Sequence, residues 1–132
     1  MRACLLIMDE EPKEGRDGTV SMRHATIDRA FKIGDWRAPT RFWLVGLVGN
    51  SPDFAGTHTI SLRFLMPDGS PGPLGTMRTV TTPPYDPDRA VCVVYREAFT
   101  LEVFKVGDKG GVTLELLIDN KPAASARLVL LK

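Results

Sequence analysis

Two cysteines and two histidines are the side chains of this chain with the most scope for covalent or metal chemistry. A catalytic thiol needs a nearby base that converts it to the thiolate. Cys4 and Cys92 both lie inside apolar runs, where an inert neutral thiol is the usual state, and no signature of a cysteine enzyme surrounds either residue. We therefore expect structural thiols and no catalytic Cys–His pair.

His24 and His58 fall at inward-facing positions near the ends of predicted strands. A zinc site needs three or four ligands in a recognisable arrangement, and the chain contains neither H-x-H nor C-x-x-C. A hydrogen-bonded histidine at a strand end is therefore the favoured interpretation. Acidic residues cluster at residues 9–17 and 86–88, in loops of a kind that can bind Ca²⁺, but basic residues lie among them. We expect solvated loops at these positions, and we expect the protein to bind no metal or other cofactor.

Aromatic residues offer a different possibility, a platform for a sugar or a peptide. Trp43 lies within a predicted strand, as does Phe42, and is expected in the core. Loop aromatics are the better functional hint, and the candidate ligand-binding residues are Trp36, Phe54 and Tyr85. The open alternative is that these rings plug the ends of a β-sandwich. No P-loop, dinucleotide fingerprint or nucleophile elbow occurs, so no enzyme is expected.

The balance of charged residues limits the classes of partner that the chain is expected to bind. The 132 residues include 17 basic and 16 acidic side chains, a net charge of +1. This balance gives no overall field to hold a polyanion, so nucleic acid is not an expected partner. The apolar run at residues 3–8 is too short for a signal peptide or a membrane span. We expect a cytoplasmic protein with no membrane partner, in which both cysteines are reduced.

Residues 57–69 are the stretch around which the predicted fold is organised. Ile60, Leu62 and Phe64 point to one side of an extended chain, which predicts a strand with one buried face. The residues between them are polar: Thr59, Ser61 and Arg63. A Pro-Asp-Gly turn at residues 67–69 ends the strand.

Similar patterns predict the other strands. A hairpin turn is expected at Asp17-Gly18 and a β-bulge near Ala25. Residues 97–106 fit extended structure and also one helical turn, and extended structure is favoured. Residues 41–48 are apolar on both faces and should be central, whereas residues 74–81 should form an edge strand. The further strands are expected at residues 3–8, 19–26, 90–95, 112–118 and 123–131, and beyond the bulge the alternation of the second continues from Ile27 through Phe31 and Ile33.

Seven to nine short strands separated by turns predict one all-β domain over residues 1–132, an antiparallel β-sandwich or a partly open barrel. The pattern G-x-H-x-I-x-L-x-F-x-x-P-D-G, followed later by a D-N-K hairpin, resembles a family of small bacterial immunoglobulin-like β-sandwich proteins catalogued as a domain of unknown function. The resemblance spans nearly the whole chain and implies a fold, but no activity, cofactor or catalytic residue. The residues that carry it are Gly56, His58, Ile60, Leu62, Phe64, Pro67, Asp68, Gly69, Asp119 and Asn120.

Two functions follow as hypotheses. The first is a non-enzymatic protein-interaction or structural module that acts as a homo-oligomer or on another protein. Along the last strand Val129 and Leu131 should face outward with Arg127, and a second copy in a homodimer could cover them. Residues 99–104 of the same chain could cover them instead. The alternative function is a small-ligand or carbohydrate-binding module that uses the loop aromatics.

Overall fold

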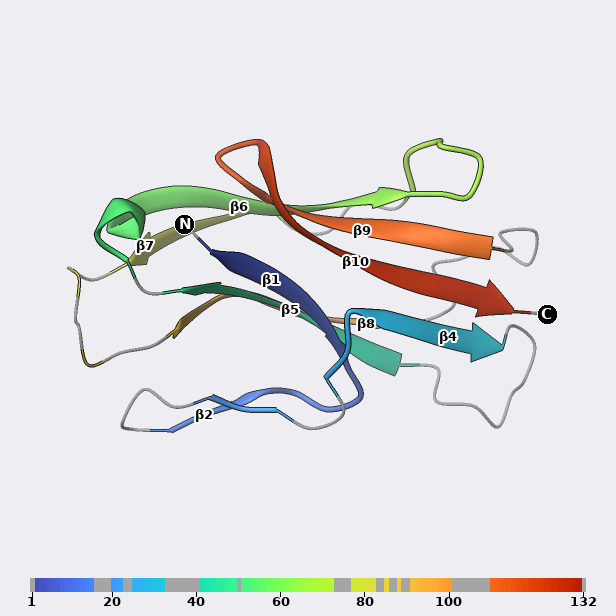
Figure 1. The fold of residues 1–132 in the computed structure, drawn as a ribbon, viewed down its shortest axis with the longest axis horizontal. Coiled ribbons are helices and arrows are strands. Elements are labelled where there is room, and N and C mark those ends of the chain that lie inside the picture. The colour runs from blue at the N-terminus through green and yellow to red at the C-terminus, as the bar shows by residue number, and fades with distance from the viewer. Residues whose placement is uncertain are drawn as a thin grey trace.

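Two β-sheets packed face to face form the protein (Figure 1). The computed structural model describes residues 2–15, 20–22, 25–32, 41–49, 51–72, 77–82, 85, 88, 91–100 and 110–131. The smaller sheet has the order β1 (Ala3–Met8), β5 (Arg41–Gly49) and β8 (Val91–Thr100). The larger has the order β4 (Asp28–Lys32), β10 (Lys121–Leu131), β9 (Gly110–Ile118), β6 (Gly56–Leu65) and β7 (Arg78–Thr82). Two short strands, β2 (Lys13–Glu14) and β3 (Val20–Ser21), form a separate hairpin, and η1 (Pro52–Phe54) is a single 3-10 turn.

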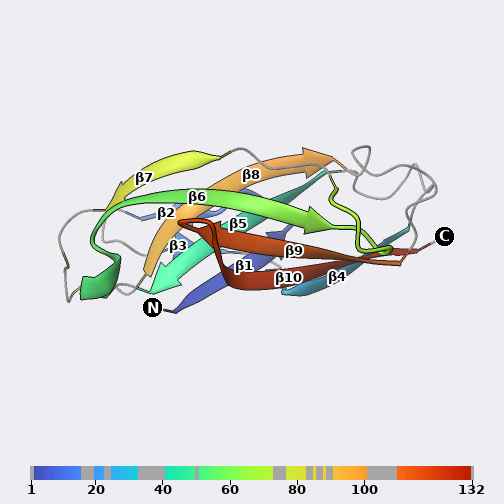
Figure 2. The ribbon, with the colours of Figure 1, turned by 90° about the horizontal axis from the view of Figure 1, so that it is seen from above.

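Seen from above, the five strands of the larger sheet lie side by side, and the smaller sheet runs beneath them (Figure 2). The described strands do not close into a barrel, so the prediction of an all-β sandwich is confirmed. Among the described strands, all pairings are antiparallel except that of β4 with β10. In the part of the chain that the structure describes, no helical segment has the length and hydropathy of a membrane span.

The core lies between the sheets and follows the alternation of each strand. Ile60, Leu62 and Phe64 of β6 are buried, and each pairs in register with a buried residue of β9. The predicted inward face of residues 57–66 is therefore confirmed. Because side chains alternate, the intervening residues of β6 must point to the outer side of the larger sheet.

β5 is buried on both of its faces, as predicted for residues 41–48. Phe42, Leu44 and Val48 join the main core, while Val45 and Leu47, together with Met8 of β1, form a second cluster on the far side of the smaller sheet. The β2–β3 hairpin lies on that far side (Figure 1). Partly buried members complete the second cluster: Cys4, Leu6, Trp43 and Val93.

One part of the chain differs from the sequence-based expectations. Within residues 19–26 the described residues form only the two-residue β3 and an isolated bridge at Thr26, and the expected turn at Asp17-Gly18 lies outside the described residues. β8 continues to Thr100, so residues 97–100 are extended, as favoured for residues 97–106, and residues 101–106 are outside the described part.

Candidate functional site

The sequence candidates for covalent chemistry lie apart. Cys4 belongs to the second cluster and Cys92 packs against the main core, with β5 between their strands. The strands of the two cysteines are two strand spacings of ~4.8 Å apart, which is farther than a disulfide can span. Both cysteines are free thiols. Burial raises the pKa of the Cys4 thiol, which disfavours its nucleophilic form. His24 lies outside the described residues, among which no group of three or more His, Cys, Asp or Glu could hold a metal ion.

The three loop aromatics do not lie in comparable environments. Phe54 is buried, with only 2% of its surface exposed, because it ends η1 and packs into the core. Tyr85 is 47% exposed. Trp36 lies outside the described residues. Phe54 therefore does not present its ring to solvent as a sugar platform requires.

The predicted dimer residues lie on an interior strand. Val129 is half-buried and is flanked in register by Gly111 of β9 and Ala30 of β4. The backbone of Leu131 pairs with Lys32, and its side chain is outside the described part. Val129 follows the buried Leu128, so its side chain faces away from the core as predicted, and its place in a homodimer interface with Leu131 stays a prediction.

His58 is held by contacts on both ring nitrogens and on one ring face. Its Nδ1 lies 2.7 Å from Oδ2 of Asp119, and its Nε2 lies 3.1 Å from the carbonyl oxygen of Phe54. Carboxylate and carbonyl oxygens only accept hydrogen bonds, so both bonds form together only when both ring nitrogens carry hydrogen. The ring also stacks on Phe54 with a centroid separation of 4.4 Å. This is the predicted hydrogen-bonded histidine at a strand end, with both ring nitrogens directed at oxygen atoms of the protein.

Asp119 holds His58 from a tight turn. Asp119 and Asn120 both have positive φ, 52° and 65°, as a two-residue hairpin of type I′ requires. The Asp119 carboxylate also accepts a hydrogen bond from the backbone N–H of Thr59 at 3.0 Å. These two contacts, with His58 the stronger, hold the pKa of the Asp119 carboxyl below its usual range. The pair ties the β9–β10 turn to the start of β6.

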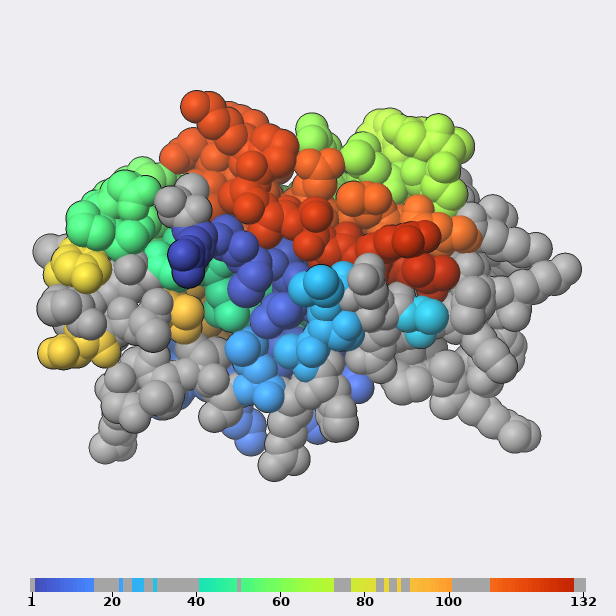
Figure 3. All heavy atoms as spheres, in the orientation of Figure 1, coloured from blue at the N-terminus to red at the C-terminus, as the bar shows by residue number. Residues whose placement is uncertain are grey.

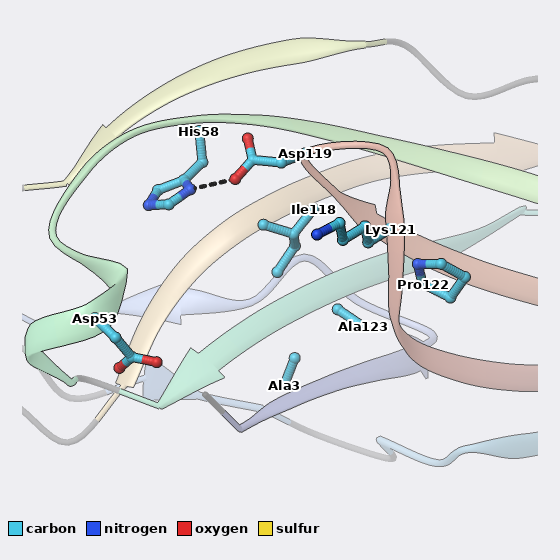
Figure 4. A pocket seen from close by; sticks show the side chains of 8 residues that line it. All are labelled: Ala3, Asp53, His58, Ile118, Asp119, Lys121, Pro122 and Ala123. Carbon is cyan, nitrogen blue, oxygen red and sulfur yellow. Dashed lines mark hydrogen bonds and ion pairs between the residues drawn. The ribbon is translucent and has the colours of Figure 1, made fainter.

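A pocket of about 460 Å³ opens beside this pair. Figure 3 shows that the start of β1, the η1 region and the β9–β10 turn meet at this end of the molecule. The pocket floor is apolar and its rim is charged (Figure 4). The lining residues are Ala3, Asp53, His58, Ile118, Asp119, Lys121, Pro122 and Ala123.

The second candidate is the outer face, by which we mean the outward side of β7, β6, β9 and β10. Its polar side chains alternate with the buried positions of these strands, and most of them are hydroxyls. Thr57 lies opposite Thr81 with their hydroxyl oxygens 3.1 Å apart, and Thr59 lies opposite Thr79. The polar residues of the outer face are Thr57, Thr59, Ser61, Arg63, Thr79, Thr81, Thr113, Glu115, Ser125 and Arg127.

Two guanidinium groups lie on this face. Nη2 of Arg63 is 2.9 Å from Oε2 of Glu115, and the arginine side chain is 41% exposed against 15% for the glutamate. Arg127 is exposed and lies against Gly111, where an added Cβ would be 2.9 Å from its Nε. Among the outer-face residues just named, Glu115 is the one carboxylate, and Arg63 is the more exposed partner of that pair.

Comparison with known proteins gives a distant fold similarity. No family model matches the chain, and no curated protein matches it. Among solved structures, the alkylpurine DNA glycosylase AlkC of Pseudomonas fluorescens, bound to DNA containing an abasic site analogue, aligns with a TM-score of 0.44 and 12% identity. The alignment covers 78% of this chain and 27% of the glycosylase, so the chain spans about a quarter of that protein. At this TM-score the similarity assigns no activity, and the resemblance to an immunoglobulin-like family stays a prediction.

Two sequence-based expectations are corrected at this point. The aligned protein is an enzyme bound to DNA. This finding runs against the first functional hypothesis, a non-enzymatic protein-interaction module. It also runs against the expected partners, which were a second copy or another protein and excluded nucleic acid. The exclusion rested on the net charge of +1, which describes the whole chain and not any one surface. The alternative, a ligand-binding module built on loop aromatics, loses Phe54 to the core.

Proposed function

We propose that the outer face binds the sugar–phosphate backbone of a nucleic acid without sequence preference. The observation that carries the proposal is the composition of this face: rows of Ser and Thr hydroxyls flank Arg63 and Arg127, and Glu115 is partly covered by Arg63. Arginine guanidinium groups and Ser or Thr hydroxyls are standard donors to phosphate oxygens. The proposal rests on these residues and not on the fold similarity.

The expected binding is weak and independent of sequence. None of the described outward residues of β7, β6, β9 and β10 is aromatic, so bases have no ring on which to stack. Two cations that neutralise two phosphates would give a slope of log K against log salt of about −1.8 on duplex DNA. Affinities for non-specific contacts of this kind are ~10⁻⁴ to 10⁻⁶ M at physiological salt.

Fluorescence anisotropy with labelled single-stranded and duplex oligonucleotides of mixed sequence, measured over a range of salt, tests the proposal. Arg127→Gln should weaken binding to all sequences alike and reduce the salt slope by about 0.9. Thr79→Glu, which places a carboxylate on the exposed edge of the face, should weaken binding as well. Arg41→Gln is the matched control, because Arg41 is an exposed arginine of the other sheet, beside Trp43.

A double variant separates arginine contacts from net charge. Arg63→Gln with Glu115→Gln removes one cation and one anion from the same ion pair, so the local charge is unchanged. If Arg63 contacts phosphate, the double variant still binds more weakly than wild type. Absence of binding at low salt, or equal losses in the Arg41 and Arg127 variants, would refute the proposal.

A reducing compartment such as the cytoplasm is part of the same proposal. Free thiols at Cys4 and Cys92 support it, since proteins of oxidising compartments tend to pair their cysteines.

A further inference from the structure

Four threonines form a block at one edge of the outer face. Thr57 and Thr59 of β6 lie opposite Thr81 and Thr79 of β7, so their side chains make a two-by-two array, which we call the threonine patch. Neighbouring members are about 4.8 Å apart across the strands and about 6.7 Å apart along them. β6 and β7 lie side by side (Figure 2), and β7 is the last strand of the larger sheet as described.

The hydroxyls of the threonine patch offer more acceptor sites than donor hydrogens. Each hydroxyl has one hydrogen to donate and two lone pairs that accept. The hydroxyl oxygens of Thr57 and Thr81 are 3.1 Å apart, so one donates to the other, and the pair still offers one hydrogen and three lone pairs. Phosphate oxygens only accept and can use the hydrogen alone. A ribose 2′-hydroxyl both donates and accepts, so it can use the lone pairs as well.

The border of the threonine patch adds a further acceptor. Oδ1 of Asp119 accepts a hydrogen bond from the backbone N–H of Thr59 at 3.0 Å, and the Asp119 side chain is 52% exposed. An ionised carboxylate has no hydrogen to donate to a phosphate, but it can accept the hydrogen of a hydroxyl. The patch and its border therefore match the sugar of a ribonucleotide better than its phosphate.

The arginines of the outer face supply the contacts to phosphate. Arg63 lies on the same strand as Thr59, four residues further on, which is about 13 Å along β6. Ser61 lies between them on the same face and continues the row of hydroxyls. A nucleic-acid backbone that crosses Arg63 therefore continues over the threonine patch.

We propose that the outer face prefers double-stranded RNA, with phosphates on Arg63 and Arg127 and ribose 2′-hydroxyls on the threonine patch. Single strands are held largely by base stacking, and the described outward residues of these strands include no aromatic ring. Double-stranded RNA displays its 2′-hydroxyls in a wide, shallow minor groove and is bound through them and its phosphates. This inference rests on the proposed function, because it names the class of nucleic acid that the same face binds.

Fluorescence anisotropy with labelled duplexes of one sequence, about 16 base pairs long, tests the inference at low salt. The duplexes are RNA, DNA and fully 2′-O-methylated RNA, which keeps the A-form but has no 2′-hydroxyl hydrogen. RNA should bind about tenfold more tightly than the other two, the effect of one or two additional neutral hydrogen bonds. The single-stranded RNA of the same sequence should bind more weakly than the RNA duplex.

Threonine variants assign the preference to the patch. Thr57→Val with Thr81→Val keeps the β-branched shape but removes two hydroxyls, so RNA binding should fall to the level of DNA binding while DNA binding is unchanged. Thr57→Ser with Thr81→Ser keeps the hydroxyls and should keep the preference. Thr100→Val is the matched control, because Thr100 ends β8 in the other sheet.

The outcomes separate this inference from the proposed function. Equal binding of RNA and DNA duplexes, both weakened by Arg127→Gln, would overturn the preference for RNA and leave backbone binding at the outer face intact. Equal binding of RNA and 2′-O-methylated RNA, or a valine double variant with the full preference, would also overturn it. Absence of binding to every duplex and single strand would overturn both.

Discussion

Gly46 lies where β5 packs closely against Leu116 of the other sheet, and an added methyl group there provides a sensitive test of the packing between the sheets. A Cβ at this position would lie 3.0 Å from both Cδ atoms of Leu116 and 3.2 Å from Cβ of Tyr95. Leu116 is fully buried, so its side chain cannot move into solvent, and the Tyr95 Cβ is fixed to the backbone of β8. Gly46→Ala should therefore overpack the core.

The expected magnitudes follow from these contacts. Overpacking costs ~1–3 kcal/mol, and the entropic benefit of replacing glycine in the unfolded chain offsets ~0.4–1 kcal/mol of it. Gly46→Ala should thus destabilise the protein by about 1–2 kcal/mol. Leu116→Ala alone should cost ~2–5 kcal/mol because it leaves a cavity. In the double variant the new methyl group occupies part of that cavity. The destabilisation of the double variant should therefore be smaller than the sum of the two single destabilisations by at least ~1 kcal/mol.

Equilibrium urea unfolding of wild type, both single variants and the double variant measures this coupling. A control cycle combines Gly46→Ala with Leu128→Ala in place of Leu116→Ala. Leu128 is equally buried, but none of its atoms is among those nearest to an added Cβ at Gly46. The control cycle should be additive within ~0.5 kcal/mol. Additivity in the Leu116 cycle, or a Gly46→Ala variant as stable as wild type, would refute the packing described here.

Three further predictions address the core, the pocket and the thiols. Phe64→Ala should lose ~3–5 kcal/mol in urea unfolding, since Phe64 is fully buried at the centre of the core, and a loss below ~1 kcal/mol would contradict that assignment. The lowered pKa of Asp119 means that its contribution to stability is present above its unfolded-state pKa of ~4 and is lost as pH falls through its folded value. Wild type should therefore lose more stability than Asp119→Asn between about pH 5 and pH 2, and parallel losses would show that the contact with His58 is not formed. Intact mass should be the same before and after reduction, because Cys4 and Cys92 are free, and a gain of two hydrogens would reveal a disulfide.

Local patterns predicted most of the fold because β-strands with one buried face repeat every two residues. This period identified the inward residues of β6 and the two-sided burial of β5. It could not identify the parallel pairing of β4 with β10, because residues 28–32 and 127–131 are distant in sequence and no local period encodes a partner. η1 was also missed, since three residues are too few to show a helical period.

The candidate sites depended on contacts that no local pattern encodes. The sequence predicted that His58 would be hydrogen-bonded at a strand end, but its partner Asp119 is 61 residues away. Phe54 looked like a loop aromatic, yet the 3-10 turn directs it into the core beneath His58. The charge argument failed for a related reason: a sum over the chain cannot say which side chains share a sheet face, whereas the strand register does.

β6 supplies residues to the pocket and to the outer face, and its register therefore determines the lining of both. His58 points to the pocket side and is bonded to Asp119, while the next residue, Thr59, points to the outer face. A slip of one residue against β9 would exchange the two sets, placing His58 among the hydroxyls and Thr59 against the core. Asp119 opposes that slip through three contacts: its carboxylate binds the His58 ring and the Thr59 N–H, and its own N–H donates to the Thr59 carbonyl at 2.8 Å. The turn residue that borders the pocket thus also keeps the threonines and Arg63 of β6 on the face where nucleic acid is proposed to bind.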